Sequence, residues 1–336
     1  MALEPPSRLT SLGNRGINAP ARVSTLLLMD VDTGVDDAIA LMLAVAQADV
    51  ELVAVTCCAG NVEASQAAAN TLAVLELCGA DGVEVAVGSE APLVEPLRTA
   101  TSHGPRGLGY AQPPAARASV SRRYGPDLIV EEARRRPGEL LLVATGPLTN
   151  LALALRREPA LPQLLRRLGV MGGSFDYRGN ATPVAEFNVW VDPEAASAVF
   201  RAFSSARERP LVAGLNVTEK TELRPEHIVQ LGENSVGGLV ADAVRVKFER
   251  KGLAHMHDPL ALALALDPTL GETRPGAVDV ELAGSVTRAM TVVDWDGLWG
   301  RAPNADVVVD VDAERFMHEL VGQLAALGRN LAGSWS

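Results

Sequence analysis

The sequence predicts a single α/β domain in which a mostly parallel, twisted sheet is covered by helices on both faces. Its 336 residues are 48% hydrophobic, which is enough to fill one large core. Apolar runs rich in Val and Leu recur along the chain, and helix-like stretches separate them. Strands that are apolar on both sides are typical of parallel sheets buried between two layers of helices. Residues 24–330 contain no internal repeat and no linker, so we expect one domain there.

The expected strands and helices alternate from the first apolar run onward. A strand at Ser24–Met29 precedes a helix at Asp37–Gln47, and a strand at Val50–Thr56 precedes an Ala-rich helix at Glu63–Leu77. Later apolar runs predict further strands at Val83–Val87, Glu139–Ala144, Leu168–Met171 and Pro210–Leu215. In such sheets ligands bind outside the carboxyl ends of the strands, so we look for chemistry in the polar residues that follow each strand.

The charge and composition of the chain limit which partners and which cellular location we expect. A formal net charge of −11 argues against a nucleic-acid partner, which would favour a basic face. The most apolar early run, Ala38–Val50, is too short to span a bilayer. Residues 1–23 lack the apolar segment of a signal peptide, and we expect a flexible N-terminal extension. Three cysteines make no disulfide framework, which favours a reducing compartment, so we expect a cytoplasmic protein without a membrane partner.

Four carboxylates follow the first expected strand within eight residues: Asp30, Asp32, Asp36 and Asp37. Capping of the next helix would explain one or two of them, because a cap needs only one side-chain acceptor. A hard cation such as Ca²⁺ or Mg²⁺ would explain all four, because it takes oxygen ligands and relieves the repulsion between the carboxylates. The sequence therefore predicts a metal site at the end of this strand.

Three known patterns can be compared with this acidic segment. An EF-hand does not fit, because a strand precedes the segment and the terminal Glu is missing. The haloacid dehalogenase phosphatases carry Asp-x-Asp-x-Thr/Val, but Gly34 stands at the fifth position and the Asp36–Asp37 pair is left unexplained. The pattern Asp-x-Asp-x-Gly-x-Asp-Asp fits at every fixed position from Asp30 to Asp37. It resembles the signature of the inosine-uridine-preferring nucleoside hydrolases.

Later segments resemble the same family in the same order along the chain. They are Thr56–Asn61, His103–Gly109, Leu142–Asn150, Met171–Gly173, Gly179–Asn180 with Glu186–Asn188, and His257–Pro259. Each one alone could be an ordinary turn, loop or helix start. Together they extend the resemblance from about Leu26 to Leu324. It implies the Rossmann-like nucleoside hydrolase fold and a homodimer or homotetramer.

The resemblance also implies a role for each site residue. Asp32, Asp37 and Asp258, with the main-chain carbonyl of Thr145, would bind Ca²⁺. The expected ribose contacts are Asp36, Asn61, Asn180, Glu186 and Asn188. Water on the metal would attack C1′ with Asp32 as the general base, and His257 would protonate the departing nucleobase. His103 and Phe248 are the expected nucleobase contacts, and the choice between purine, pyrimidine and broad specificity stays open.

Two other functions also stay open from the sequence. One is a Mg²⁺-dependent phosphatase with Asp30 as its nucleophile and a lysine beside the site. The other is a nucleoside- or ribose-binding protein that kept the metal site and lost turnover. The expected substrate of the main hypothesis is a small ribonucleoside, whose N-glycosidic bond is hydrolysed to give ribose and free base.

Overall fold

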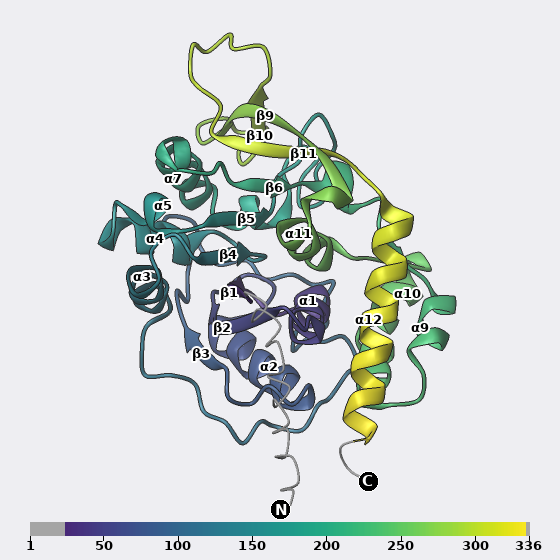
Figure 1. Ribbon diagram of the computed structural model, residues 1–336. Helices are drawn as coiled ribbons and strands as arrows, with labels where there is room; N and C mark the ends of the chain where they lie inside the picture. The colour runs from purple at the N-terminus through teal and green to yellow at the C-terminus, as the bar shows by residue number, and fades with distance from the viewer. Residues whose placement is uncertain (1–23, 334–336) are drawn as a thin grey trace, which may run out of the picture.

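A nine-stranded sheet runs through the centre of the protein, whose computed structural model describes residues 24–333 (Figure 1). Its strands are β1 (Thr25–Val31), β2 (Val50–Cys57), β3 (Glu84–Val87), β4 (Leu140–Ala144), β5 (Arg167–Met171), β6 (Leu211–Ala213), β9 (Gly271–Val280), β10 (Thr291–Asp294) and β11 (Ala305–Val311). They lie in the order β10-β9-β11-β6-β5-β4-β1-β2-β3. Neighbours from β11 to β3 are parallel, whereas β9 pairs antiparallel with both β11 and β10.

Helices cover both faces of this sheet and bury two apolar layers (Figure 1). One layer is formed with α1 (Val35–Ala46), α2 (Ala64–Leu77), α10 (Ser235–Lys251), α11 (His257–Leu266) and α12 (Ala313–Gly333). The other is formed with α3 (Gly125–Arg135), α4 (Thr149–Arg157), α5 (Leu161–Leu164) and α7 (Pro193–Ala202). The predicted fold class, a mostly parallel α/β sheet with helices on both faces, is confirmed.

Short elements complete the described chain. They are the helices α6 (Phe187–Val191), α8 (Leu215–Thr218) and α9 (Pro225–Leu231), two 3₁₀ turns at Phe203–Ser205 and Pro268–Leu270, and the strand pair β7 (Glu222–Leu223) and β8 (Ala254–His255). α6 and α8 lie close to the carboxyl ends of β5 and β6, and each carries polar residues that reach the site described below.

The acidic segment begins inside the sheet rather than in a loop. β1 runs two residues beyond its predicted end, because Asp30 still pairs with both β2 and β4. α1 begins at Val35, two residues earlier than predicted, so Asp36 and Asp37 lie in its first turn. The free N–H groups of a helix start favour negative charge, which suits both residues to this position.

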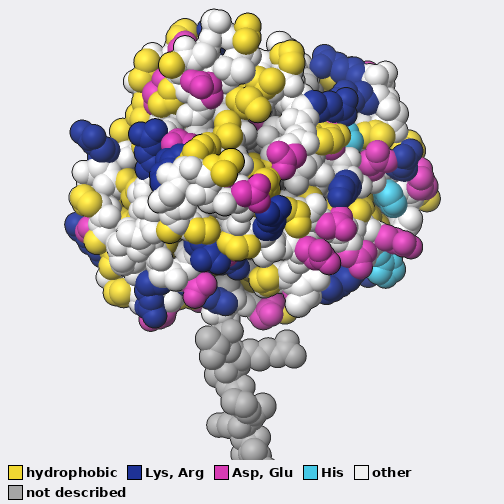
Figure 2. Space-filling model, turned by 90° about the horizontal axis from the view of Figure 1, so that it is seen from above, with side chains coloured by type: hydrophobic (Ala, Val, Ile, Leu, Met, Phe, Trp, Pro, Cys, Tyr) yellow, Lys and Arg dark blue, Asp and Glu magenta, His cyan; other side chains and the backbone are white. Residues whose placement is uncertain are grey.

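The surface mixes charges of both signs. Figure 2 shows Lys and Arg side chains interspersed with Asp and Glu on the face that it presents. Of the helices within residues 24–333, none combines the length and the hydropathy that a membrane crossing requires. The predicted N-terminal extension, residues 1–23, lies outside the described part of the chain.

Candidate active site

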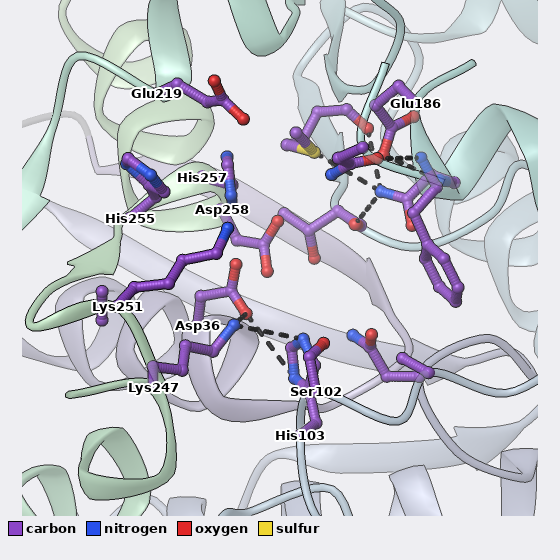
Figure 3. Close-up of a pocket in the computed structure, with 18 of the residues that line it drawn as sticks. Asp36, Ser102, His103, Glu186, Glu219, Lys247, Lys251, His255, His257 and Asp258 are labelled. Atoms are coloured by element: carbon purple, nitrogen blue, oxygen red, sulfur yellow. Dashed lines mark hydrogen bonds and ion pairs between the residues drawn. The ribbon is translucent and has the colours of Figure 1, made fainter. Parts of the chain in front are cut away.

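A pocket of about 260 Å³ lies where the central parallel strands end (Figure 3). The segments after β1, β2, β4 and β5 reach it, together with α6, α10 and α11. Its lining includes most of the residues singled out from the sequence: Asp36, Asn61, His103, Thr145, Asn180, Glu186, Asn188, His257 and Asp258. The fold therefore gathers motifs that are far apart along the chain at one edge of the sheet.

Buried carboxylates form the floor of this pocket. Asp36, Asp37 and Asp258 offer carboxylate oxygens that lie within 4.8 Å of one another, and all three side chains are buried. Asp32 lies beside them, fully buried, and its Oδ1 has no hydrogen-bond partner within residues 24–333. Burial and then the charge of Asp37 raise the pKa of Asp32 well above its usual value. The cluster thus contains more negative charge than its own surroundings neutralise.

Backbone and amide donors fix two of these carboxylates. Asp32 Oδ2 accepts a hydrogen bond from the main-chain N–H of Asn61 at 2.6 Å. Asp37 accepts from the N–H of Gly34 at 2.9 Å and from the hydroxyl of Thr145 at 2.8 Å. The Asn61 amide also donates to Asp37 at 3.3 Å. These bonds position the two carboxylates, and within residues 24–333 they leave Asp32 Oδ1 without a hydrogen-bond partner, which suits a site that holds a cation.

Burial raises the pKa of Asp37 and Asp258, and neighbouring carboxylates add to the effect. Asp36 behaves differently because Lys247 and His103 face it. Burial alone would raise its pKa, but Lys247 and His103 lower it to about 2. Lys247 Nζ and His103 Nδ1 each lie 3.8 Å from Asp36 Oδ1. The ionised form of Asp36 is therefore favoured.

Asp30 does not line the pocket. Its Oδ1 accepts hydrogen bonds from Thr56 Oγ1 at 2.6 Å and from Asn150 Nδ2 at 2.8 Å. The side chain is fully buried, and burial raises its pKa to about 7. Asp30 thus ties β1 to β2 and to α4 beneath the site.

The far wall holds three polar side chains from the segment around α6. Glu186 caps α6, and its carboxylate accepts from the N–H of Asn188 at 2.7 Å and of Gly173 at 3.0 Å. Burial raises the pKa of Glu186 to about 7. Asn188 Nδ2 donates to the carbonyl of Thr145 at 2.7 Å. Asn180 is exposed, and its Oδ1 accepts from the N–H of Phe187 at 2.9 Å.

Two histidines and a lysine line the opposite side. His257, the first residue of α11, places its Nδ1 2.8 Å from Thr218 Oγ1, and burial lowers its pKa to about 4. The N–H of Val35 donates to His103 Nδ1 at 3.0 Å. Burial and then Lys247 lower the pKa of His103 to about 3. Both rings are thus neutral at pH 7.

The structure does not bring Phe248 to the pocket. Phe248 packs against the hydrophobic core, and its neighbour Lys247 lines the pocket instead. Consecutive residues of a helix point about 100° apart, so only one of the two can face the site. Lys247, Lys251 and Glu219 line this side and were missed in the sequence, because no motif surrounds them.

Comparisons with known proteins point to one family. The family model described as inosine-uridine preferring nucleoside hydrolase matches residues 27–318. The pyrimidine-specific ribonucleoside hydrolase RihA of Citrobacter koseri is 37% identical over 309 residues, covering 89% of this chain and 97% of that protein. The inosine-uridine preferring nucleoside hydrolase of Leishmania major is 33% identical over 312 residues, covering 90% and 98%.

Solved structures agree in fold. A plant nucleoside hydrolase and a purine-preferring ribonucleoside hydrolase from Gardnerella vaginalis each superpose with a TM-score of 0.85 at 30% identity. Each match covers 90% of this chain and 99% of the other. The fold, the buried site and the matches to known proteins together define the class of this protein, which is a hydrolase that acts on N-glycosyl compounds. Within that class, the chain belongs to the inosine-uridine preferring nucleoside hydrolase family.

Proposed function

We propose that this protein is a calcium-dependent ribonucleoside hydrolase that releases ribose and the free nucleobase. The observation that carries the proposal is the buried carboxylate cluster at one end of a pocket whose other walls offer amides, histidines and a lysine. Such a pocket can hold a polar sugar against the carboxylates and keep a planar base away from them. The cytoplasmic location and the homodimer or homotetramer remain predictions.

The residues present fit a calcium ion. We propose Asp32, Asp37, Asp258 and the carbonyl of Thr145 as its ligands. The unpartnered Oδ1 of Asp32 and the raised pKa of all three carboxyls support this set. Asn188 donates to the Thr145 carbonyl, but a carbonyl oxygen has a second lone pair that can face a cation.

The distances also favour Asp36 near the ion, since its carboxylate clusters with Asp37 and Asp258. Lys247 already balances the charge of Asp36, whereas within the described chain no cation does so for Asp32. We therefore keep Asp36 as a ribose contact and Asp32 as a ligand. A bound calcium ion would supply the positive charge that keeps these carboxyls ionised and makes a nearby water more acidic.

The ribose would be held by the polar residues of the floor and the far wall, namely Asp36, Asn61, Asn180, Glu186 and Asn188. Breaking an N-glycosidic bond gives an oxocarbenium-like state, positive at C1′ and the ring oxygen. Hydroxyl contacts fix C1′ beside the attacking water, which is a proximity effect. Asp32, ionised in the loaded site, would accept the proton of that water.

The leaving base would lie on the side of His103 and His257. With its Nδ1 next to the Thr218 hydroxyl, His257 can carry its proton on Nε2 and donate a hydrogen bond from there. We propose this donation as its contribution to base departure. Asp36, and to a smaller extent Glu219, favours the protonated ring. His103 would contact the base, whereas Phe248 packs against the core and does not line the pocket.

A panel assay tests this function against its alternatives. Purified protein with Ca²⁺ is given a mixture of nucleosides, and free ribose is measured as reducing sugar. A parallel sample receives a phosphomonoester with Mg²⁺. We expect ribose and no phosphate, because Asp30 is buried outside the pocket and cannot reach a substrate. Phosphate release would support the phosphatase, and nucleoside binding without ribose release would support the binding protein.

A further inference from the structure

The base side of the pocket carries positive charge that the proposed reaction does not use. Lys247, Arg250 and Lys251 all come from α10 and line the cavity there. The carboxylate on this side of the lining is Glu219, and it is already engaged. It accepts from Arg178 at 2.8 Å and from the Tyr177 hydroxyl at 3.0 Å. A ligand that reaches this end of the pocket therefore meets cationic side chains, and the carboxylate beside one of them, Lys247, is that of Asp36.

Lys247 is the best placed of these cations. Its side chain is 16% exposed, and Figure 3 shows it extending from α10 toward Asp36 and His103. Its Nζ lies 3.8 Å from Asp36 Oδ1, which is beyond hydrogen-bond distance. Asp36 in turn belongs to the cluster that is proposed to hold the ribose. The ammonium is thus one side chain away from the position of the sugar.

The ammonium of Lys247 also lacks a true acceptor at His103. Its Nζ lies 3.3 Å from His103 Nε2. The main-chain N–H of Val35 donates to Nδ1 of the same ring at 3.0 Å, so the ring proton must sit on Nε2. A protonated nitrogen cannot accept a hydrogen bond from an ammonium. Among residues 24–333, Lys247 therefore keeps its donors available to whatever enters the cavity.

We propose that Lys247 is a catalytic residue that stabilises the departing nucleobase as an anion, and that it favours bases able to place this charge on a carbonyl oxygen, such as uracil. This inference rests on the proposed function. A fixed positive charge in a site that excludes water stabilises charge that develops in the transition state. Bases that present an amino group to Lys247 would gain nothing from it, because two donors would then face each other.

The step balances without a further reactant. The bond from C1′ to the base nitrogen breaks, and its electron pair moves onto the base, where Lys247 faces it. The oxygen of water forms the new bond to C1′, and its proton passes to Asp32. The anionic base then takes a proton from solvent, and Asp32 returns one to solvent. The products are ribose and the neutral base.

Lys247 could instead have the structural role of neutralising Asp36. The two roles differ in whether the loss of activity in a Lys247 variant depends on the leaving group of the substrate. The variants are K247M, which keeps the length of the stem, K247R, which keeps the charge, and R245M as a matched control. Arg245 is on the same helix, packs on Tyr110 4.6 Å from the ring centroid and does not line the pocket. The substrates are uridine and p-nitrophenyl β-D-ribofuranoside, whose nitrophenolate leaves as a stable anion without help. Thermal unfolding and calorimetric Ca²⁺ binding check that each variant is folded and loaded.

We expect K247M to lower kcat/KM for uridine by about 10²-fold, the effect typical of removing one such donor. The nitrophenyl substrate should change by less than about threefold, because metal and ribose contacts cancel in the comparison. K247R should recover part of the loss, and R245M should match wild type. Equal losses on both substrates would make Lys247 only the partner of Asp36 and overturn the proposal, as would no loss on either. If the wild-type protein releases no ribose from any nucleoside, the proposed function itself fails. This result is distinct from any difference between the wild-type protein and the Lys247 variants.

Discussion

Calcium should stabilise the protein against heat, and more strongly at pH 8 than at pH 5.5. The reason is that calcium must displace protons from the buried carboxyls proposed to bind it, and these carboxyls hold fewer protons at pH 8. Burial raises the pKa of Asp30 from 3.8 to about 7, and those of Asp32, Asp37 and Asp258 are raised as well. A carboxyl with a raised pKa in the folded state stabilises the fold fully below its unfolded pKa, and it loses this contribution as the pH rises through the folded pKa. The metal-free protein therefore loses stability between about pH 4 and pH 7.

The size of the effect follows from these shifts. In the metal-free protein, the change from 3.8 to about 7 for Asp30, which lies outside the proposed ligand set, corresponds to about 4 kcal/mol as an order of magnitude, and about half of this is lost between pH 5.5 and pH 8. Calcium at roughly 1,000 times its Kd adds about 4 kcal/mol. With an unfolding entropy of about 2.1 cal/mol/K per residue over roughly 300 residues, this raises Tm by about 6 °C.

The assay is calorimetric unfolding of metal-stripped protein at both pH values, with and without Ca²⁺. The D37N variant should lose the calcium-dependent rise. D310N should keep it, because Asp310 is an exposed carboxylate paired with Lys220 outside the site. A Tm that calcium does not change would refute the metal site. An equal rise at pH 5.5 and pH 8 would refute the linkage to these carboxyls.

Three substitutions test the residue roles. Asp32→Asn should lower turnover by about 10²–10⁴-fold while circular dichroism stays native, since it removes the proposed base; a value within a few-fold of wild type would place the base elsewhere. Asn188→Ala should impair kcat and KM for ribonucleosides far more than it weakens the Ca²⁺ affinity measured by calorimetry, because a positioning contact is lost. The reverse pattern would make Asn188 a support of the metal site. His257→Ala should slow uridine hydrolysis strongly and p-nitrophenyl riboside hardly at all, and equal losses would assign His257 to support of Asp258.

The core of the sheet could be predicted from the sequence because its strands are buried on both faces. Continuous apolar runs such as Leu140–Ala144 have no other stable place in a domain of this size. The antiparallel edge formed by β9, β10 and β11 was not predicted. β9 carries Gly271, Arg274 and Pro275 in the half that pairs with β11 and not with β10. Such residues are tolerated where one side of a strand is unpaired, but they obscure a strand in the sequence.

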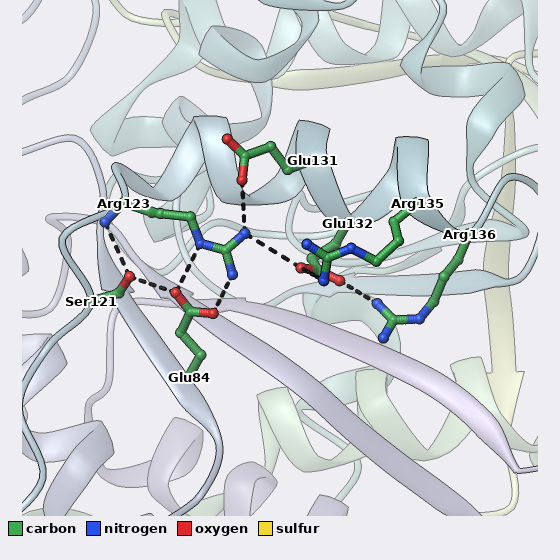
Figure 4. Close-up of polar contacts among 7 residues, drawn as sticks. All are labelled: Glu84, Ser121, Arg123, Glu131, Glu132, Arg135 and Arg136. Carbon is green, nitrogen blue, oxygen red and sulfur yellow. Dashed lines mark hydrogen bonds and ion pairs between the residues drawn. The ribbon is translucent and has the colours of Figure 1, made fainter.

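Pocket residues that stand in local motifs could be predicted from the sequence. Pocket residues that are placed by long-range contacts could not. The acidic segment and His257–Asp258 stand in short patterns whose geometry is set by a strand end or a helix start. Whether Lys247 or Phe248 reaches the pocket depends on which side of α10 faces the site, and no local pattern gives this. Figure 4 shows a similar case outside the site, where Arg123 holds the edge strand β3 through Glu84 and contacts Glu131 on α3. The contact between Arg123 and Glu84 joins residues 39 positions apart and leaves no local pattern.

The most direct test of the central claim is a proton NMR time course of one nucleoside with metal-stripped protein, before and after Ca²⁺ is added. The buffer contains no phosphate, so water is the only acceptor for the sugar. We expect no change before calcium, and equimolar ribose and free base afterwards, with the D32N variant silent in both phases. Full activity in the verified metal-free sample, or an intact nucleoside after calcium is added for every base offered, would contradict the account.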